Sequence, residues 1–270
     1  MCPLDVLAEY RITNEPFYDA TGDEVALFGL AYAQKLPVML KGPTGCGKSR
    51  FVEYMAFRLG RPLVTVACHE DMVASDLIGR YLLDARGTFW QDGPLTLAAR
   101  HGAICYLDEL VEARQDTTVV IHPLTDSRRV LPLDKKGELL RAHPDFQLVM
   151  SYNPGYQGLS KDMKPSTRQR FVALAFDYPD TAQEIKILCC ETGIAEAIAQ
   201  KLVSIAQQSR SLTQHGLAEG VSTRMLSHAA TLIQQGATVR ASCELALINP
   251  LSDDLDVLRA LRALVDAQLG

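Results

Sequence analysis

Five short apolar runs in the first two thirds of the chain have the character of buried strands. They are rich in β-branched and aromatic residues and show almost no alternation with polar residues. The runs occupy residues 37–41, 62–68, 103–108, 146–152 and 171–178. Because strands without polar alternation are covered on both faces, the pattern predicts an α/β fold with a largely parallel five-stranded sheet between layers of helices.

Helical spacing of apolar residues fills the segments between these runs and dominates the rest of the chain. Before residue 180 it predicts helices over residues 23–34, 48–59, 95–100 and 116–124. Beyond residue 180 apolar residues recur every three or four positions up to residue 269, and the only strand-like pair is Thr238-Val239. We therefore expect an α/β domain over residues 1–180 and a small all-helical domain over residues 181–270. Within that second domain, Ser222 has the character of a helix start.

Two segments between the runs are too long to be plain connections and carry hairpin signals. In the first, short apolar runs at residues 81–83 and 88–90 flank a turn at residues 84–87. In the second, residues 129–133 and 138–141 flank a turn at residues 134–137. Long insertions of this kind are usually functional or disordered, and as functional segments both hairpins are candidate contact elements.

The first apolar run is followed by a phosphate-binding signature, G-x-x-x-x-G-K-S. Such a loop points successive backbone N–H groups at phosphate oxygens, and the following helix adds a favourable dipole. Lys48 would reach the β and γ phosphates and the Ser49 hydroxyl would bind Mg²⁺, so ATP and Mg²⁺ are the expected cofactors. The signature consists of Gly42, Pro43, Thr44, Gly45, Cys46, Gly47, Lys48 and Ser49.

The third run ends in two carboxylates, Asp108 and Glu109. Asp108, at the carboxyl end of a strand beside the P-loop, is expected to hold Mg²⁺ directly or through water. Glu109 separates hydrolysis from mere binding, because a hydrolase requires a base that orients and deprotonates the attacking water. The alternative of a helix-capping pair loses weight beside a P-loop.

Three further sites are candidates for sensing or completing the reaction. Asn153, at the tip of the fourth run, could hydrogen-bond the γ-phosphate or the attacking water. Arg170, with Arg168 as the second choice, could be offered to a neighbouring subunit's γ-phosphate, which would make hydrolysis depend on assembly. Arg224 opens a helix against the dipole and therefore favours an anion nearby, such as the nucleotide phosphates.

Composition narrows the function classes. The net charge of −5 and the lack of a basic run argue against nucleic acid as the main partner. The longest apolar runs are too short for a membrane span, and the N-terminal stretch lacks the features of a secretory signal, so we expect a cytoplasmic protein. Seven cysteines without metal-type spacing indicate reduced thiols.

The order of these motifs resembles an AAA+ ATPase over nearly the whole chain. Two insertions resemble those of the MoxR group. The first is a helix-2 insertion (about residues 70–93) that ends in the stretch Trp90 to Leu95, and the second is a hairpin before sensor 1 (about residues 128–143), which precedes Asn153. The phrases ACHEDMVASDLIGRYLL, DELVEARQDTTVVIHPLTDSRR, SYNPGYQGL and KPSTRQRFVAL resemble the CbbQ/NorQ branch, with CbbQ-type members the nearer match.

This resemblance implies a hexameric ring with a lid-like helical domain and a partner that carries a von Willebrand factor A domain. CbbQ-type relatives are chaperone-like motors that act on Rubisco and release inhibitory sugar phosphates, whereas NorQ-type relatives serve nitric oxide reductase. Head-to-tail contact through an arginine must either close into a ring or continue as a filament.

Three other functions remain open at this level. A small-molecule kinase is disfavoured by Glu109 and Arg224, and a nucleic-acid motor by the acidic balance. A regulatory module that binds nucleotide without turnover would be excluded by phosphate release that depends on Glu109.

Overall fold

The computed structural model describes residues 6–85, 87–153, 163–212 and 219–269. By internal contacts the chain forms two units. The first comprises the residues up to Pro16 together with Gly22–Gly42 and Lys48–Phe176. The second comprises Phe17–Thr21, the five loop residues Pro43–Gly47, and the chain from Asp177 onward.

The first unit is built on a parallel five-stranded sheet with the order β2-β5-β8-β1-β9. Every predicted strand is present, so the α/β prediction is confirmed. Buried side chains fill β5 and β8, which lie inside the sheet, as expected for strands covered on both faces. The strands are β1 Val38–Lys41, β2 Leu63–Ala67, β5 Ile104–Asp108, β8 Gln147–Tyr152 and β9 Val172–Ala175.

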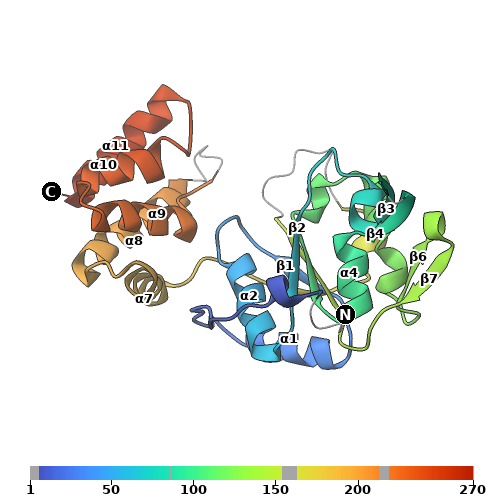
Figure 1. Cartoon of the computed structure of the whole chain (residues 1–270). Coiled ribbons are helices and arrows are strands. Elements are labelled where there is room, and N and C mark those ends of the chain that lie inside the picture. Colours follow the sequence, from blue (N-terminus) through green and yellow to red (C-terminus); the bar gives the residue numbers. More distant parts are fainter. Residues whose placement is uncertain (1–5, 86, 154–162, 213–218, 270) are drawn as a thin grey trace. The chain divides into compact units, whose positions relative to one another are not determined.

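Helices cover both faces of this sheet. Helices α1 (Glu24–Ala33) and α2 (Lys48–Leu59) lie on one side and α4 (Pro94–His101) on the other (Figure 1). Phe28 of α1 and Phe51 of α2 are buried in an edge-to-face pair with ring centroids 5.4 Å apart. The shorter elements are η1 Ala8–Tyr10, α3 Ala74–Ile78, η2 Leu110–Glu112 and α6 Pro165–Arg168.

The prediction of a continuous helix over residues 116–124 is wrong. The segment forms α5 (Gln115–Val119) and then a separate 3₁₀ turn, η3 (His122–Leu124). Pro123 has no N–H for an α-helical hydrogen bond, and it disfavours helical geometry in the residue before it. The apolar spacing therefore continues across a break in the helix.

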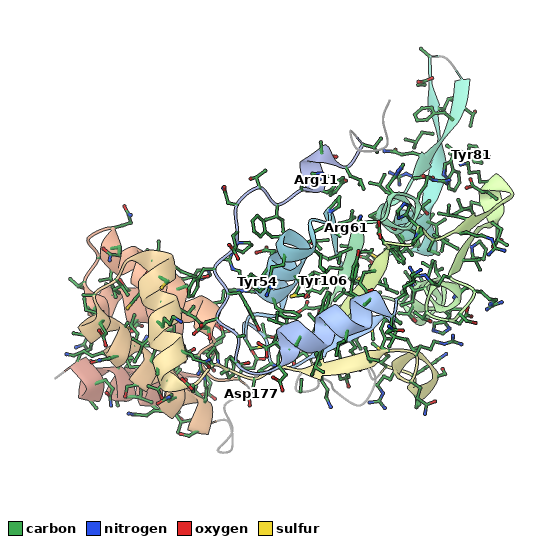
Figure 2. All side chains as sticks on the ribbon, turned by 90° about the horizontal axis from the view of Figure 1, so that it is seen from below. Arg11, Tyr54, Arg61, Tyr81, Tyr106 and Asp177 are labelled. Atoms are coloured by element: carbon green, nitrogen blue, oxygen red, sulfur yellow. The ribbon has the colours of Figure 1, made fainter. Side chains whose placement is uncertain are left out.

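Both expected hairpins are formed. Strand β3 (Gly79–Asp84) pairs with β4 (Gly87–Asp92), and β6 (Val130–Leu133) pairs with β7 (Glu138–Arg141) across the turn η4 (Asp134–Lys136). Arg86, inside the first predicted turn, lies outside the described residues. Tyr81 marks the β3-β4 hairpin, which projects from the sheet (Figure 2).

Arg100 of α4 joins the two hairpins. Its guanidinium donates to Asp92 of β4 at 2.8 Å and to Glu138 of β7 at 2.7 and 3.3 Å. Lys136 pairs with Glu138 at 2.7 Å and lies 6.0 Å from the centre of the Trp90 ring. The insertions are thus held to one another through a helix of the main layer.

The second unit is helical over its described residues after Asp177. Ser222 caps α9, whose start follows the sequence prediction, and Thr238 caps α10 instead of beginning a strand. The buried core includes Leu188, Leu202 and Leu226. The helices are α7 Thr181–Thr192, α8 Glu196–Ser211, α9 Thr223–Gln234, α10 Val239–Cys243, the π-helical turn η6 Glu244–Ile248, and α11 Leu255–Leu269. Among all described residues, no helix combines the length and apolar character needed to cross a bilayer.

Candidate nucleotide site

The P-loop joins the end of β1 to the start of α2. Gly42 is buried at a point where a Cβ atom would collide with the Phe176 carbonyl, so only glycine fits. Lys48, the first residue of α2, donates from Nζ to the Gly42 carbonyl at 2.8 Å. Gly45 and Gly47 have φ values of 70° and 99°, which residues other than glycine rarely adopt. The chain therefore has the turn that a phosphate-binding loop requires.

The middle of the loop packs within the second unit, next to the start of α9. A Cβ atom on Gly45 would lie 2.7 Å from Ser222 and 3.4 Å from the Cβ of Arg224. Arg224, the second residue of α9, is exposed at that point. The predicted sensing arginine and the phosphate-binding loop therefore lie side by side within one unit.

The carboxylate pair lies at the carboxyl end of β5. Asp108 is its last residue, and its Oδ1 accepts hydrogen bonds from the Tyr106 hydroxyl at 2.7 Å and the Ser151 hydroxyl at 2.5 Å. The Tyr106 hydroxyl is also 3.3 Å from the Ser49 hydroxyl. Since the Tyr106 proton is used on Asp108, Ser49 donates in that contact. Ser49 and Asp108, the two predicted metal ligands, are thus linked through one buried phenol.

Glu109 follows in a left-handed conformation with φ 54° and ψ 43°. Its backbone N–H donates to the Ser151 hydroxyl at 2.7 Å, and its residue surface is exposed. A non-glycine residue in this region costs about 1–2 kcal/mol, and such strain concentrates at functional sites. Ser151 therefore holds the Asp108 carboxylate, to which it donates, and the backbone of Glu109, from which it accepts.

Sequence reasoning missed Tyr106 and Ser151. Tyr106 lies two residues before Asp108 on the same strand, so strand periodicity places both side chains on one face. That signal was present in the sequence. Ser151 lies on β8, and only the pairing of β5 with β8 brings it to Asp108. Burial and the Asp108 carboxylate raise the pKa of Tyr106, which keeps its hydroxyl protonated as a donor.

The donor set suits a hard divalent cation. A hydroxyl and a carboxylate are oxygen ligands of the type that Mg²⁺ prefers. Both hydrogen bonds from side chains of the described residues reach Oδ1 of Asp108, and none reaches Oδ2. This arrangement fixes the carboxylate, and its Oδ2 and the Ser49 hydroxyl are the oxygens that would hold a metal ion.

The remaining predicted residues lie at opposite ends of the parallel strands, some at the carboxyl ends and some at the amino ends. Asn153 is half-buried directly after β8, whose last residue, Tyr152, pairs with Lys41 at the loop end of β1. Arg168 ends α6 and Arg170 follows it, just before β9. Val172 of β9 pairs with Val38 at the start of β1. The two arginines therefore lie at the amino ends of the strands, opposite the carboxyl end of β1 where the P-loop begins. Three strand steps of about 3.3 Å separate those ends.

Comparison with known proteins agrees with this geometry. A family model described as "AAA domain (dynein-related subfamily)" matches residues 37–171, and one described as "CbbQ/NirQ/NorQ C-terminal" matches residues 184–268. The chain belongs to the CbbQ/NirQ/NorQ family of AAA+ proteins. The resemblance inferred from the motifs is therefore confirmed.

Relatives within the CbbQ/NirQ/NorQ family match almost the full length. Protein CbbQ of Hydrogenophilus thermoluteolus is 63% identical over 260 residues, covering 96% of this chain and 97% of that protein. Denitrification regulatory protein NirQ of Pseudomonas aeruginosa is 61% identical, covering 94% of this chain and 98% of its own, and Protein NorQ of Paracoccus denitrificans is 58% identical, covering 95% of each. A RuvB mutant from Thermotoga maritima has a TM-score of 0.55 at 13% identity, covering 95% of this chain and 74% of that chain, which shows the shared fold.

Membership in an AAA family together with the P-loop indicates an ATPase that binds a nucleotide with a metal ion. CbbQ-named and NorQ-named relatives are similar to this chain to nearly the same degree, so identity does not select between them.

Proposed function

We propose that this protein is an ATP-hydrolysing AAA+ ring motor. The observation that carries the proposal is a set of linked hydrogen bonds. Tyr106 joins Ser49 to Asp108, and Ser151 joins Asp108 to the backbone N–H of Glu109. A protein that only binds nucleotide has less use for the second carboxylate.

Each predicted residue then has a chemical role. Lys48 counters phosphate charge, and Ser49 with Asp108 holds Mg²⁺, which supplies charge neutralisation at the phosphates. Glu109 orients and deprotonates the attacking water, and Asn153 reads the terminal phosphate. Arg224 would respond to the presence or absence of the γ-phosphate.

The arginines before β9 support assembly in a ring. Arg168 and Arg170 lie just before the amino end of β9, away from their own P-loop, which is the placement that action on a neighbour's nucleotide requires. We assign Arg170 as the arginine finger and Arg168 as the second candidate. A contact of this head-to-tail kind forms either a ring or a filament, and we propose a closed ring of six subunits.

Phosphate release tests the hydrolytic proposal. The purified protein is expected to release phosphate from ATP in the presence of Mg²⁺. Glu109→Gln should retain ATP and lose turnover, whereas Lys48→Ala should lose ATP affinity. Glu109→Gln protein that turns over at the wild-type rate would refute the assignment of the base.

For the client, we propose Rubisco, activated together with a partner that carries a von Willebrand factor A domain. The preference follows the CbbQ-like phrases of the sequence, and the 63% identity to a protein named CbbQ is consistent with it. The nearly equal identity of 58% to a protein named NorQ keeps nitric oxide reductase as the alternative. The test adds ATP, this protein and the partner to Rubisco blocked by a sugar phosphate. Recovery of carboxylation supports the Rubisco proposal; activation of nitric oxide reductase instead would overturn it.

A further inference from the structure

A chain of contacts within the second unit runs from the P-loop to the start of α9. It begins at the Thr44 carbonyl, which accepts a hydrogen bond from the Tyr178 hydroxyl at 3.1 Å. The Tyr178 ring lies under the guanidinium of Arg210, with 3.9 Å from Cζ to the ring centre. Asp177, labelled in Figure 2, is the residue before Tyr178 and the point where the chain passes from the sheet to the helices.

The contacts continue through a buried ion pair. Arg210 of α8 donates to both carboxylate oxygens of Glu184 at 2.9 and 2.7 Å, and to the Val221 carbonyl at 2.8 Å. Glu184 of α7 is fully buried and also accepts from the Thr223 hydroxyl at 2.5 Å. Thr223 is the first residue of α9 and stands next to Arg224.

Burying this carboxylate is expensive, and its partners compensate for that expense without large net stabilisation. Replacing a buried ion pair with apolar residues is often neutral or stabilising, so a pair of this kind is weak evidence of a role in stability. What it does provide is geometry, because a planar guanidinium with three fixed bonds and a ring beneath it has one orientation. The pair therefore sets where α7, α8 and the start of α9 lie relative to Tyr178.

The bond to Thr44 acts on the part of the loop that faces phosphate. A peptide unit is planar, and its C=O and N–H point in opposite directions. A hydroxyl that holds the Thr44 carbonyl therefore fixes the direction of the Gly45 N–H, one of the donors of a P-loop. Burial and nearby Glu219 raise the pKa of Tyr178 to about 12, so the hydroxyl remains a donor at physiological pH.

We propose that Tyr178, Arg210 and Glu184 are positioning residues that couple the conformation of the P-loop to the placement of Arg224. This inference rests on the proposed nucleotide site and deepens it. The helical unit then controls nucleotide affinity through Tyr178, and nucleotide binding in turn orders the start of α9.

The first test compares two tyrosine variants in the full chain. Tyr178→Phe removes the hydroxyl and keeps the ring beneath Arg210. Tyr32→Phe is the matched control, because the Tyr32 hydroxyl also donates to a backbone carbonyl, that of Asp145 at 3.3 Å, before β8 and away from the loop. We expect Tyr178→Phe to bind a fluorescent ADP analogue about two- to tenfold more weakly than wild type, from the net value of one hydrogen bond. The control should bind as wild type does, and both should melt at similar temperatures without nucleotide.

The second test asks whether the contacts act as one relay. Thr223→Val removes the bond to Glu184 at the α9 end of the contact chain, opposite the end at Tyr178. Thr231→Val is the control, since its hydroxyl donates to the Ser227 carbonyl within the same helix. A relay predicts weaker binding of the analogue for Thr223→Val alone, and a combined effect with Tyr178→Phe smaller than the sum.

Equal affinity of the Tyr178→Phe and Tyr32→Phe proteins for the analogue would overturn the proposal, as would wild-type affinity of Thr223→Val. Neither result would contradict ATP hydrolysis by the wild-type protein. Wild-type protein that binds the analogue but releases no phosphate from ATP would instead refute the proposed function, while the affinity comparison would still decide the relay.

Discussion

Arg100 offers a direct test of how the two hairpins are held. The substitution Glu138→Gln keeps the size of the side chain and removes its charge. It weakens the bonds from Arg100 at 2.7 and 3.3 Å and the contact with Lys136 at 2.7 Å. Arg100 keeps its second partner, Asp92, whereas Lys136 loses its carboxylate partner at a side chain that is 31% exposed to water.

The expected magnitude follows from the ionisation of Glu138. The Arg100 guanidinium, and after it Lys136, lower the pKa of Glu138 to about 2, against an ordinary value of 4.5. A difference of that size corresponds to about 3 kcal/mol of interaction with the ionised form. The side chains of Arg100 and Glu138 are 27% and 30% exposed, so solvent screening reduces the net contribution to about 1–2 kcal/mol.

The pH dependence has a defined direction. Because the folded protein holds Glu138 ionised more strongly than the unfolded chain does, its contribution is fully present above about pH 5 and disappears as the pH falls towards 2. Wild type and Glu138→Gln should therefore differ in free energy of unfolding at pH 7 and converge in acid. Glutamine at this position behaves as a permanently neutral glutamic acid.

Urea unfolding followed by tryptophan fluorescence measures this effect where it arises. Trp90 is the sole tryptophan of the chain and lies on the β3-β4 hairpin beside Lys136. Glu53→Gln is the matched control, since Glu53 pairs with Arg50 in an exposed contact at 3.3 Å that should contribute about 0.5 kcal/mol or less. Equal free energies of unfolding of wild type and Glu138→Gln at pH 7 would refute the reasoning. A difference between them that stays constant down to pH 3 would also refute it.

Three further predictions address the site and the helical core. Tyr106→Phe should raise the Mg²⁺ concentration for half-maximal phosphate release about tenfold, because Asp108 loses one of its two orienting bonds; an unchanged requirement would contradict the metal assignment. Arg170→Ala should bind ATP and hydrolyse it poorly even when assembled, and mixing it with Lys48→Ala protein should restore some turnover at mixed interfaces; wild-type turnover of Arg170→Ala would move the assignment to Arg168 or end it. Leu202→Ala, at a fully buried position, should lower the free energy of unfolding by about 2–5 kcal/mol in chemical denaturation, and a loss under 1 kcal/mol would contradict the packed core.

Structural features that depend on residues close together in the sequence could be predicted from the sequence. Apolar runs revealed all five strands of the sheet, and turn residues revealed both hairpins, because these features depend on neighbouring residues. The P-loop and the Asp108-Glu109 pair were also visible, since each occupies consecutive positions. The prediction over residues 116–124 was wrong because the break at Pro123 outweighed the apolar spacing.

The sequence by itself therefore determined the fold class and the local chemistry of the loop and the carboxylates. Only the tertiary structure decided which distant side chains complete them: Ser151 reaches Asp108 because β8 pairs with β5, and Arg170 stands away from its own loop because β9 pairs with β1. Strand order arises from packing across the whole sheet, which no local pattern encodes. The burial of Glu184 between Arg210 and Thr223 has the same origin, since three separate helices must meet before a carboxylate can be removed from water.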